Sequence, residues 1–99
     1  MASNFKISRS ASKGTTHLYL KGDFDGTSAY ELIKEIDKAC TKKNRILIYT
    51  NKLRKIYPFA CGILQNGMSF RKDRLDRVRF ADKKLKETCP FGRMLQMRP

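Results

Sequence analysis

A helical stripe between two strand-like stretches places the strongest constraint on the fold of this chain. In residues 28–40, apolar side chains recur at the spacing of one helix face, at Ala29, Leu32, Ile33, Ile36 and Cys40. Ser28 and Glu31 have the spacing of a capping box at the start of this helix, and Thr27 is a rival cap. Because an apolar helix face must pack on another element, we expect a sheet beside it.

Short segments on both sides of this helix have the pattern of strands. Residues 4–8 and 17–22 alternate apolar and polar side chains, which predicts a hairpin around Gly14 at a sheet edge. Residues 46–49 form a continuous apolar run, which predicts a parallel strand buried on both faces. Strand, helix and strand then form a βαβ unit. Residues 76–82 alternate again and predict a strand with one exposed face near an edge.

Two further helices are expected in the second half of the chain. Residues 56–70 contain no charged side chain, although a basic residue adjoins each end. Pro58 disfavours helix at Tyr57, so we expect this helix to begin around Ala60. A last short helix is expected within residues 82–92, with Asp82 as its candidate cap. Leu85 and Cys89 are expected to face inward, and Pro90 with Gly92 is expected to end the helix.

Length and composition indicate one α/β domain with a strong positive charge. The 99 residues suffice for a single hydrophobic core, with residues 1–3 and 93–99 as tails. Lys and Arg number 22 against 9 Asp and Glu, which gives a formal net charge of +13. Such a charge predicts attraction to something anionic: nucleic acid, a membrane surface or an acidic protein.

The sequence carries no signal for secretion or membrane insertion. Its first ten residues lack the apolar segment of a signal peptide, and no stretch reaches the roughly 20 apolar residues that span a bilayer. We therefore expect a soluble cytoplasmic protein without a membrane partner. Three cysteines without a CxxC pair fit a reducing compartment better than a disulfide scaffold. We expect Cys61 to be a small buried apolar residue, with a reactive thiolate at a helix start as the alternative.

The sequence shows little that could perform catalysis. It contains neither a G-x-x-x-x-G-K-[ST] loop nor a G-x-G-x-x-G loop. Its single histidine, His17, is expected at the surface, and Asp23 with Asp25 is expected to form a turn. We therefore expect no enzymatic activity, no cofactor and no metal site.

Two loops in this order of elements carry motifs. Residues 18–36 contain a strand, a G-x-x-D loop formed by Gly22 and Asp25, and a helix. Residues 56–64 contain a loop in which Gly62 precedes Ile63. The order and separation of these motifs resemble the STAS domain of sulfate transporters and anti-sigma factor antagonists. The resemblance implies an α/β sandwich, with a mixed sheet of about four strands and helices packed on it.

The resemblance also implies a function, with one departure. In the antagonist branch, a partner kinase phosphorylates a loop serine that follows an aspartate. Here Phe59 and Ala60 occupy those positions, and the alternative register puts Cys61 at the serine. We therefore expect a non-catalytic regulatory interaction module that lacks this switch and binds an acidic or anti-sigma-like regulatory protein. The expected contact residues are Asp25, Gly26, Thr27, Tyr57, Phe59, Ala60, Cys61 and Gly62, with an anion-facing group in the preceding loop, Lys52, Arg54 and Lys55.

A small nucleic-acid-binding protein is the alternative function. Basic residues cluster in two runs, which are Lys42, Lys43, Arg45, Lys52, Arg54 and Lys55, then Arg71, Lys72, Arg74, Arg77, Arg79, Lys83, Lys84 and Lys86. A solvated surface of high charge is the simpler interpretation of both runs. The sequence has no RNP-type motif, zinc finger or helix-turn-helix. Its aromatic residues are also not clearly interleaved with the basic runs, as base stacking would require.

Overall fold

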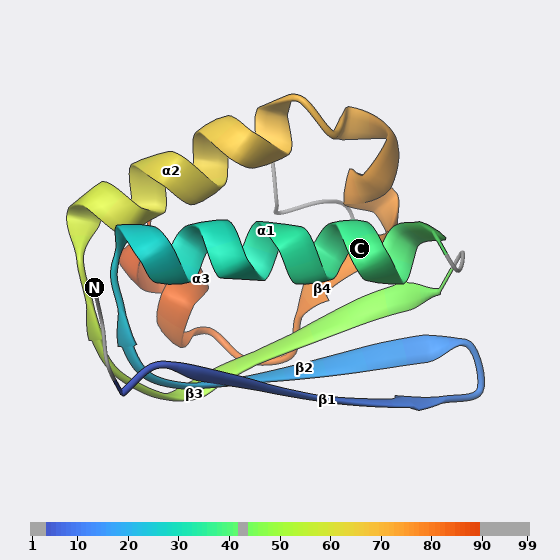
Figure 1. Ribbon diagram of the computed structural model, residues 1–99, viewed down its shortest axis with the longest axis horizontal. Helices are drawn as coiled ribbons and strands as arrows, with labels where there is room; N and C mark the ends of the chain where they lie inside the picture. The colour runs from blue at the N-terminus through green and yellow to red at the C-terminus, as the bar shows by residue number, and fades with distance from the viewer. Residues whose placement is uncertain (1–3, 42–43, 90–99) are drawn as a thin grey trace.

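One face of a four-stranded mixed sheet carries the three α-helices of the described residues (Figure 1). The computed structural model describes residues 4–41 and 44–89. Its strands are β1 Lys6–Ser12, β2 Thr15–Phe24, β3 Arg45–Ile56 and β4 Val78–Phe80. Its helices are α1 Gly26–Thr41, α2 Pro58–Ser69 and α3 Lys84–Thr88, with a 3-10 helix, η1 Lys72–Arg77, before β4.

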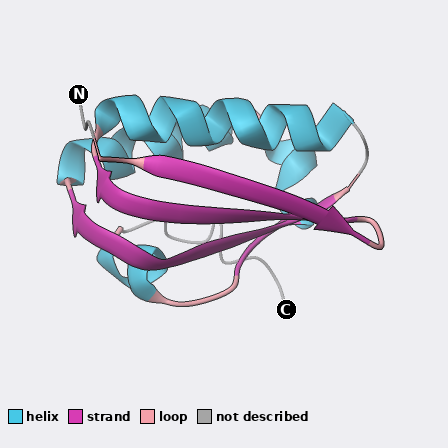
Figure 2. Ribbon diagram, turned by 60° about the horizontal axis from the view of Figure 1, so that its bottom comes forward, coloured by secondary structure: helices cyan, strands magenta, loops and turns pink. Residues whose placement is uncertain are grey.

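The strands lie side by side in the order β1-β2-β3-β4 (Figure 2). β1 and β2 form an antiparallel hairpin, whereas β2 with β3 and β3 with β4 are parallel pairs. α1 is therefore the crossover between two parallel neighbours, and α2 with η1 joins β3 to β4. These pairings confirm the predicted edge hairpin, the βαβ unit and the α/β sandwich of about four strands.

The hydrophobic core lies between the sheet and the helices. The predicted apolar stripe of α1 is buried along its whole length, and each of its five residues is 8% exposed or less. Leu18, Leu20 and Phe24 of β2 belong to the same cluster and are almost fully buried. Since burial of one such side chain contributes about 1.5–3 kcal/mol, this layer supplies most of the stability of the fold.

Two arginines attach the neighbouring elements to α1. The Arg9 guanidinium of β1 donates two hydrogen bonds to Glu35, at 2.9 and 2.8 Å. Arg71, just after α2, donates two to Asp37 at 2.8 and 3.1 Å. These partners raise the pKa of each arginine, and Arg9 lowers the pKa of Glu35. The paired geometry fixes α1 relative to the sheet edge on one side and to α2 on the other.

β3 differs from its prediction in length and in burial. It extends to Ile56, and its burial alternates, with Ile46 and Ile48 each 1% exposed while Leu47 and Tyr49 are half-buried. The expectation of burial on both faces was wrong, because the described helices cover one face only (Figure 1). We call the uncovered side of the sheet the open face.

The start of α3 also differs from the expectation. Asp82 was expected to cap this helix, but its carboxylate accepts hydrogen bonds from the backbone N–H groups of Thr50 and Asn51, at 2.9 and 3.1 Å. The helix is capped by Lys83 without a side-chain bond, and Leu85 is fully buried as predicted. Asp82 therefore closes the edge of β3 beyond the short strand β4, where two backbone donors would lack a partner.

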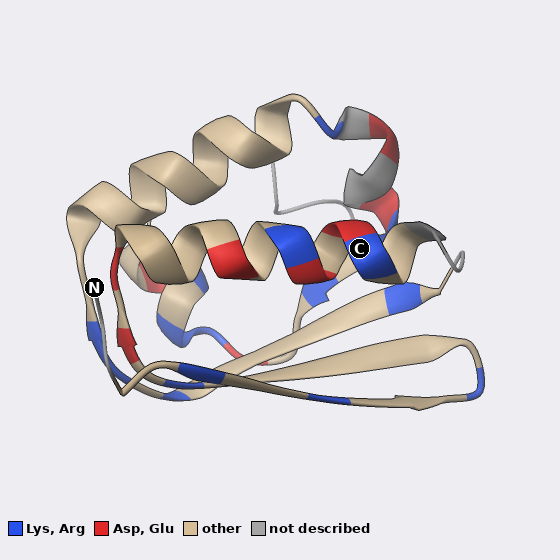
Figure 3. Ribbon diagram, in the orientation of Figure 1, with Lys and Arg blue, Asp and Glu red and all other residues tan. Residues whose placement is uncertain are grey.

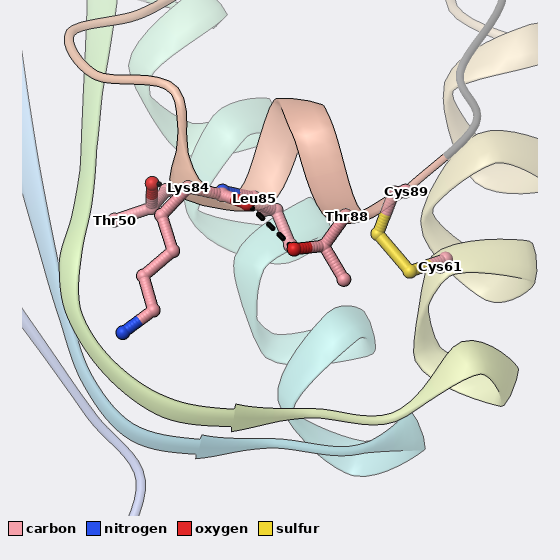
Figure 4. The surroundings of a disulfide bond; sticks show 6 residues. All are labelled: Thr50, Cys61, Lys84, Leu85, Thr88 and Cys89. Carbon is pink, nitrogen blue, oxygen red and sulfur yellow. Dashed lines mark hydrogen bonds between the residues drawn. A yellow bond between two sulfur atoms is a disulfide. The ribbon is translucent and has the colours of Figure 1, made fainter.

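A disulfide joins Cys61 of α2 to Cys89 after α3 (Figure 4). Both residues are buried, and their Cα atoms lie 5.3 Å apart, which is an ordinary spacing for a disulfide. Cys40 is buried on α1 outside this pair. This bond corrects the expectation that all three cysteines are reduced. The expected cytoplasmic localisation rested partly on that expectation. The inward position of Cys89 is confirmed.

Several sequence predictions fall outside the described residues. They are the tails at 1–3 and 93–99, the stop signals Pro90 and Gly92, and the first two residues of the first basic run, Lys42 and Lys43.

Candidate functional site

The candidate contact surface lies where β2 leads into α1 and β3 leads into α2. The two helices begin at the same end of the molecule (Figure 1). The backbone N–H of Tyr57 donates to the carbonyl of Phe24 at 3.0 Å, which holds the two strand-to-helix connections side by side. Pro58 occupies the first turn of α2, where its missing N–H costs nothing, so the helix begins two residues before the predicted start.

The residues of the G-x-x-D motif have structural roles at this end. Gly22 has φ +94°, and a Cβ there would lie 2.1 Å from the carbonyl oxygen of Asn4. Only glycine therefore allows the backbone of Asn4 and Phe5 to lie so close to β2. Asp25 caps α1, since its Oδ1 accepts from the Ser28 N–H at 2.9 Å and from the Ser28 hydroxyl at 2.8 Å. Ser28 is thus a buried partner of the cap, and the predicted capping box with Glu31 was wrong.

Replacing Asp25 with alanine is expected to lower the free energy of unfolding by about 1 kcal/mol at neutral pH. The hydrogen bond from the Ser28 N–H holds the pKa of Asp25 below its usual value of 3.8. A depressed pKa means that this contribution is complete above the unfolded-state pKa and is lost as pH falls through the folded one. Urea unfolding at pH 7 and at progressively lower pH should show the gap between wild type and Asp25→Ala closing below about pH 4. A constant gap would contradict the capping role.

Phe59 is the more exposed of the two aromatic side chains predicted to contact a partner. It is 75% exposed, yet its ring lies against Gly26, because a Cβ on Gly26 would meet two Phe59 ring atoms at 3.3 Å and Ile63 Cδ1 at 3.0 Å. Glycine at the start of α1 thus lets α2 approach closely. Tyr57 is 40% exposed beside it. Aromatic side chains are enriched at the centre of protein interfaces, where they often act as anchors.

Tyr30 belongs to the same end and was missed by the sequence analysis. It is 60% exposed on α1, three residues after Thr27, which is also exposed. Residues three apart on a helix share a surface, so Tyr30 extends the patch along α1. The sequence could have indicated Tyr30, because it is an aromatic residue on the polar side of an amphipathic helix. We call Thr27, Tyr30, Tyr57 and Phe59 the helix pole.

Other predicted contact residues are not presented to a partner. Ala60 is fully buried, and Cys61 is buried and held in the disulfide. The Asp25 carboxylate is occupied as a helix cap. Gly62 is exposed one turn into α2, and a Cβ there would contact nothing within 4 Å.

The three predicted anion-facing residues lie in β3 and point to different places. The expectation of a loop was wrong, because the strand continues to Ile56. Arg54 pairs with Asp23 at 3.3 Å, and the Lys55 ammonium lies 5.6 Å from the centre of the Tyr57 ring. Lys52 is the register partner of Lys21 and lies on the open face. Lys55 is therefore the one residue of the three that adds a cation beside the helix pole.

Residues 4–41 and 44–89 contain no group of three or more His, Cys, Asp and Glu side chains that could hold a metal ion. Within the same ranges, every helix is too short or too polar to span a bilayer.

The architecture matches a solved regulatory protein. No family model and no curated protein matches the sequence. A search of solved structures matches the anti-sigma factor antagonist SpoIIAA in its unphosphorylated form, with a TM-score of 0.59 at 15% sequence identity. The match covers 89% of this chain and 83% of that one. The chain has the STAS fold. At this identity the likeness establishes the STAS architecture, and the suspected resemblance is confirmed at that level.

Proposed function

We propose that this STAS-fold chain is a non-catalytic regulatory module that binds a partner protein through the helix pole. The observation that carries the proposal is Phe59 of α2, a phenylalanine that is 75% exposed and whose ring lies against Gly26 of α1. Exposing such a ring to water is unfavourable, and burying it against a partner recovers that free energy. The similar fold of an anti-sigma factor antagonist supports a regulatory role of the same kind.

The partner is a regulatory protein with an acidic rim around an apolar pocket. Phe59 and Tyr57 would fill the pocket, and Lys55 would face the rim. The chain has no serine or threonine in the first turn of α2, where the buried Ala60 occupies the position that the family resemblance assigns to the phosphorylated serine. Binding is therefore constitutive and is not released by serine phosphorylation in this turn. Positive charge acts mainly on the association rate, so binding weakens as salt screens it.

Affinity capture from nuclease-treated lysate of the source cells tests the proposal. Wild type should retain a discrete protein, and Phe59→Ala should lose it, since truncating an anchor costs about 2 kcal/mol or more, or about thirtyfold in affinity. Phe70→Ala is the matched control, because Phe70 is 78% exposed at the other end of α2. Phosphatase treatment of both samples should leave capture unchanged. Equal retention by Phe59→Ala and Phe70→Ala would rule out the helix pole.

A further inference from the structure

The open face of the sheet carries a stack of aromatic rings. Tyr19 of β2 and Tyr49 of β3 are register partners, and their rings stack with centroids 4.4 Å apart and planes 16° from parallel. His17 lies beside them, with its ring centre 5.8 Å from that of Tyr49 and its Nδ1 2.9 Å from the Tyr49 hydroxyl oxygen. Tyr19 remains 41% exposed. Rings held in this way form a platform on which another planar group can stack.

One face of the Tyr19 ring is stacked on Tyr49, and the His17 ring lies beside Tyr19 along β2, with ring centres 6.3 Å apart and planes 17° from parallel. Tyr49 covers the side toward β3, so the other ring face is directed toward β1, where the register partner of Tyr19 is Ser8. Arg9 reaches Glu35 of α1 on the helix side of the sheet, and the alternation of a strand therefore puts Ser8 on the open face. Ser8 is exposed and too short to cover an aromatic ring. A flat group thus has room above Ser8 against Tyr19.

Basic side chains border this platform at both ends. Lys6, Lys21 and Lys52 form one register row across β1, β2 and β3. Arg45 of β3 lies at the other end as the register partner of Thr15, and Arg79 of β4 lies in the register row of Leu47 and His17. All five are exposed, and none of them has a carboxylate partner among residues 4–41 and 44–89.

Acidic residues are almost absent from the strands. Of the nine in the chain, Asp23 alone lies in a strand, and it is paired with Arg54 at 3.3 Å. Figure 3 shows basic residues along the strands and acidic residues on α1, on η1 and near the end of β2. Burial and the neighbouring Tyr19 raise the pKa of Tyr49 above its usual value, so this phenol adds no negative charge at neutral pH. The platform therefore lies in a positive field.

We propose that the open face binds single-stranded nucleic acid, with one base stacked on Tyr19 and the phosphates held by Lys21, Lys52 and Arg45. Flat rings between unpaired cations match the alternation of bases and phosphates along a single strand. A duplex hides its base faces, and an acidic protein surface lacks the regular alternation of planar groups and negative charges along one strand. This site cannot be found from the sequence pattern, because its aromatic and basic residues come from separate strands that only the sheet brings together. The surface is distinct from the helix pole.

Fluorescence anisotropy with labelled strands of about twelve nucleotides tests the stacking. The probes are oligo(U) RNA, oligo(dT) DNA, an abasic phosphodiester of equal length and a DNA duplex. Wild type should bind RNA or DNA single strands on the order of tenfold more tightly than the abasic strand. Tyr19→Ala should lose this preference, whereas Tyr19→Phe and the surface control Phe70→Ala should keep it. Circular dichroism would verify that each variant is folded.

The salt dependence of the same titration tests the phosphate contacts. Affinity for a single strand falls with salt by about 0.7 logarithmic units per phosphate contact and tenfold change in salt. Lys21→Ala with Lys52→Ala should therefore reduce the slope by about 1.4 between roughly 50 and 200 mM salt. The matched pair on the helices, Lys34→Ala with Lys86→Ala, should leave it unchanged. Equal affinity of wild type for oligo(dT), oligo(U) and the abasic strand, a preference for the duplex, or equal slopes for the two pairs would overturn the proposal.

Discussion

Removing the disulfide between α2 and α3 is expected to lower the free energy of unfolding by about 3 kcal/mol. The bond connects residues 28 positions apart, so in the unfolded chain it closes a loop of that length and reduces the conformational entropy. α3 has only five residues and is too short to be stable alone. Its attachment rests on the buried Leu85 side chain, on hydrogen bonds from the Leu85 N–H and the Lys84 ammonium to β3, and on this bond. Cys61→Ala with Cys89→Ala should therefore unfold at a clearly lower urea concentration than the oxidised wild type.

Dithiothreitol provides the control for this prediction. Reduction should destabilise the wild type by about the same 3 kcal/mol and leave the double alanine variant unchanged. Cys40→Ala should keep the sensitivity to reduction, because Cys40 lies outside the bond. Thiol titration of the oxidised, unfolded protein should detect one thiol of the three cysteines. Identical unfolding of the oxidised and reduced wild type would contradict the stabilising role of the disulfide.

Gly22→Ala is expected to destabilise the protein by about 3 kcal/mol. Its φ of +94° disfavours any side chain, and the added Cβ would lie 2.1 Å from the Asn4 carbonyl oxygen. The clash is with backbone, so either Asn4 or β2 must move. Movement of Asn4 would also break the hydrogen bond from the Asp23 N–H to the Asn4 side chain, at 3.3 Å. Urea unfolding measures the loss.

Gly14→Ala separates backbone strain from the clash. Gly14 also has a positive φ, of +80°, but a Cβ there would meet nothing within 4 Å. This variant should therefore cost about 1 kcal/mol, the strain alone. If both variants lost the same stability, the close approach of the Asn4 backbone to β2 would not be the reason for glycine at position 22.

The periodicity of the sequence predicted the topology of the sheet, but it did not predict how many faces of the sheet the helices cover. Leu18 and Leu20 alternate with polar residues, so the inward face of β2 was readable. In residues 46–49 of β3 the side chains on both faces are apolar, and a run containing Leu47 and Tyr49 looks the same whether helices cover one face or two. The difference depends on where α2 and α3 pack, which is a tertiary property.

The position of the candidate site stays a prediction, and its details differ from the sequence-based expectation. The aligned loops placed it at the helix starts, and Phe59 and Tyr57 are exposed there. Local rules fit Ser28 and Asp25 equally well as helix caps, and burial of Ser28 beneath the Asp25 carboxylate decides between them. The Cys61–Cys89 pair had no spacing signal, because packing of α3 against α2 brings its members together.

Site-specific photo-crosslinking tests the central claim, that the helix pole is the surface that binds a partner protein. A benzophenone analogue of phenylalanine would replace Phe59 in one sample and Phe70 in another, since both side chains are similarly exposed, at 75% and 78%. After irradiation in nuclease-treated lysate of the source cells, position 59 should yield one discrete crosslinked protein and position 70 should yield none. Equal products from both positions, or none from position 59, would contradict the account.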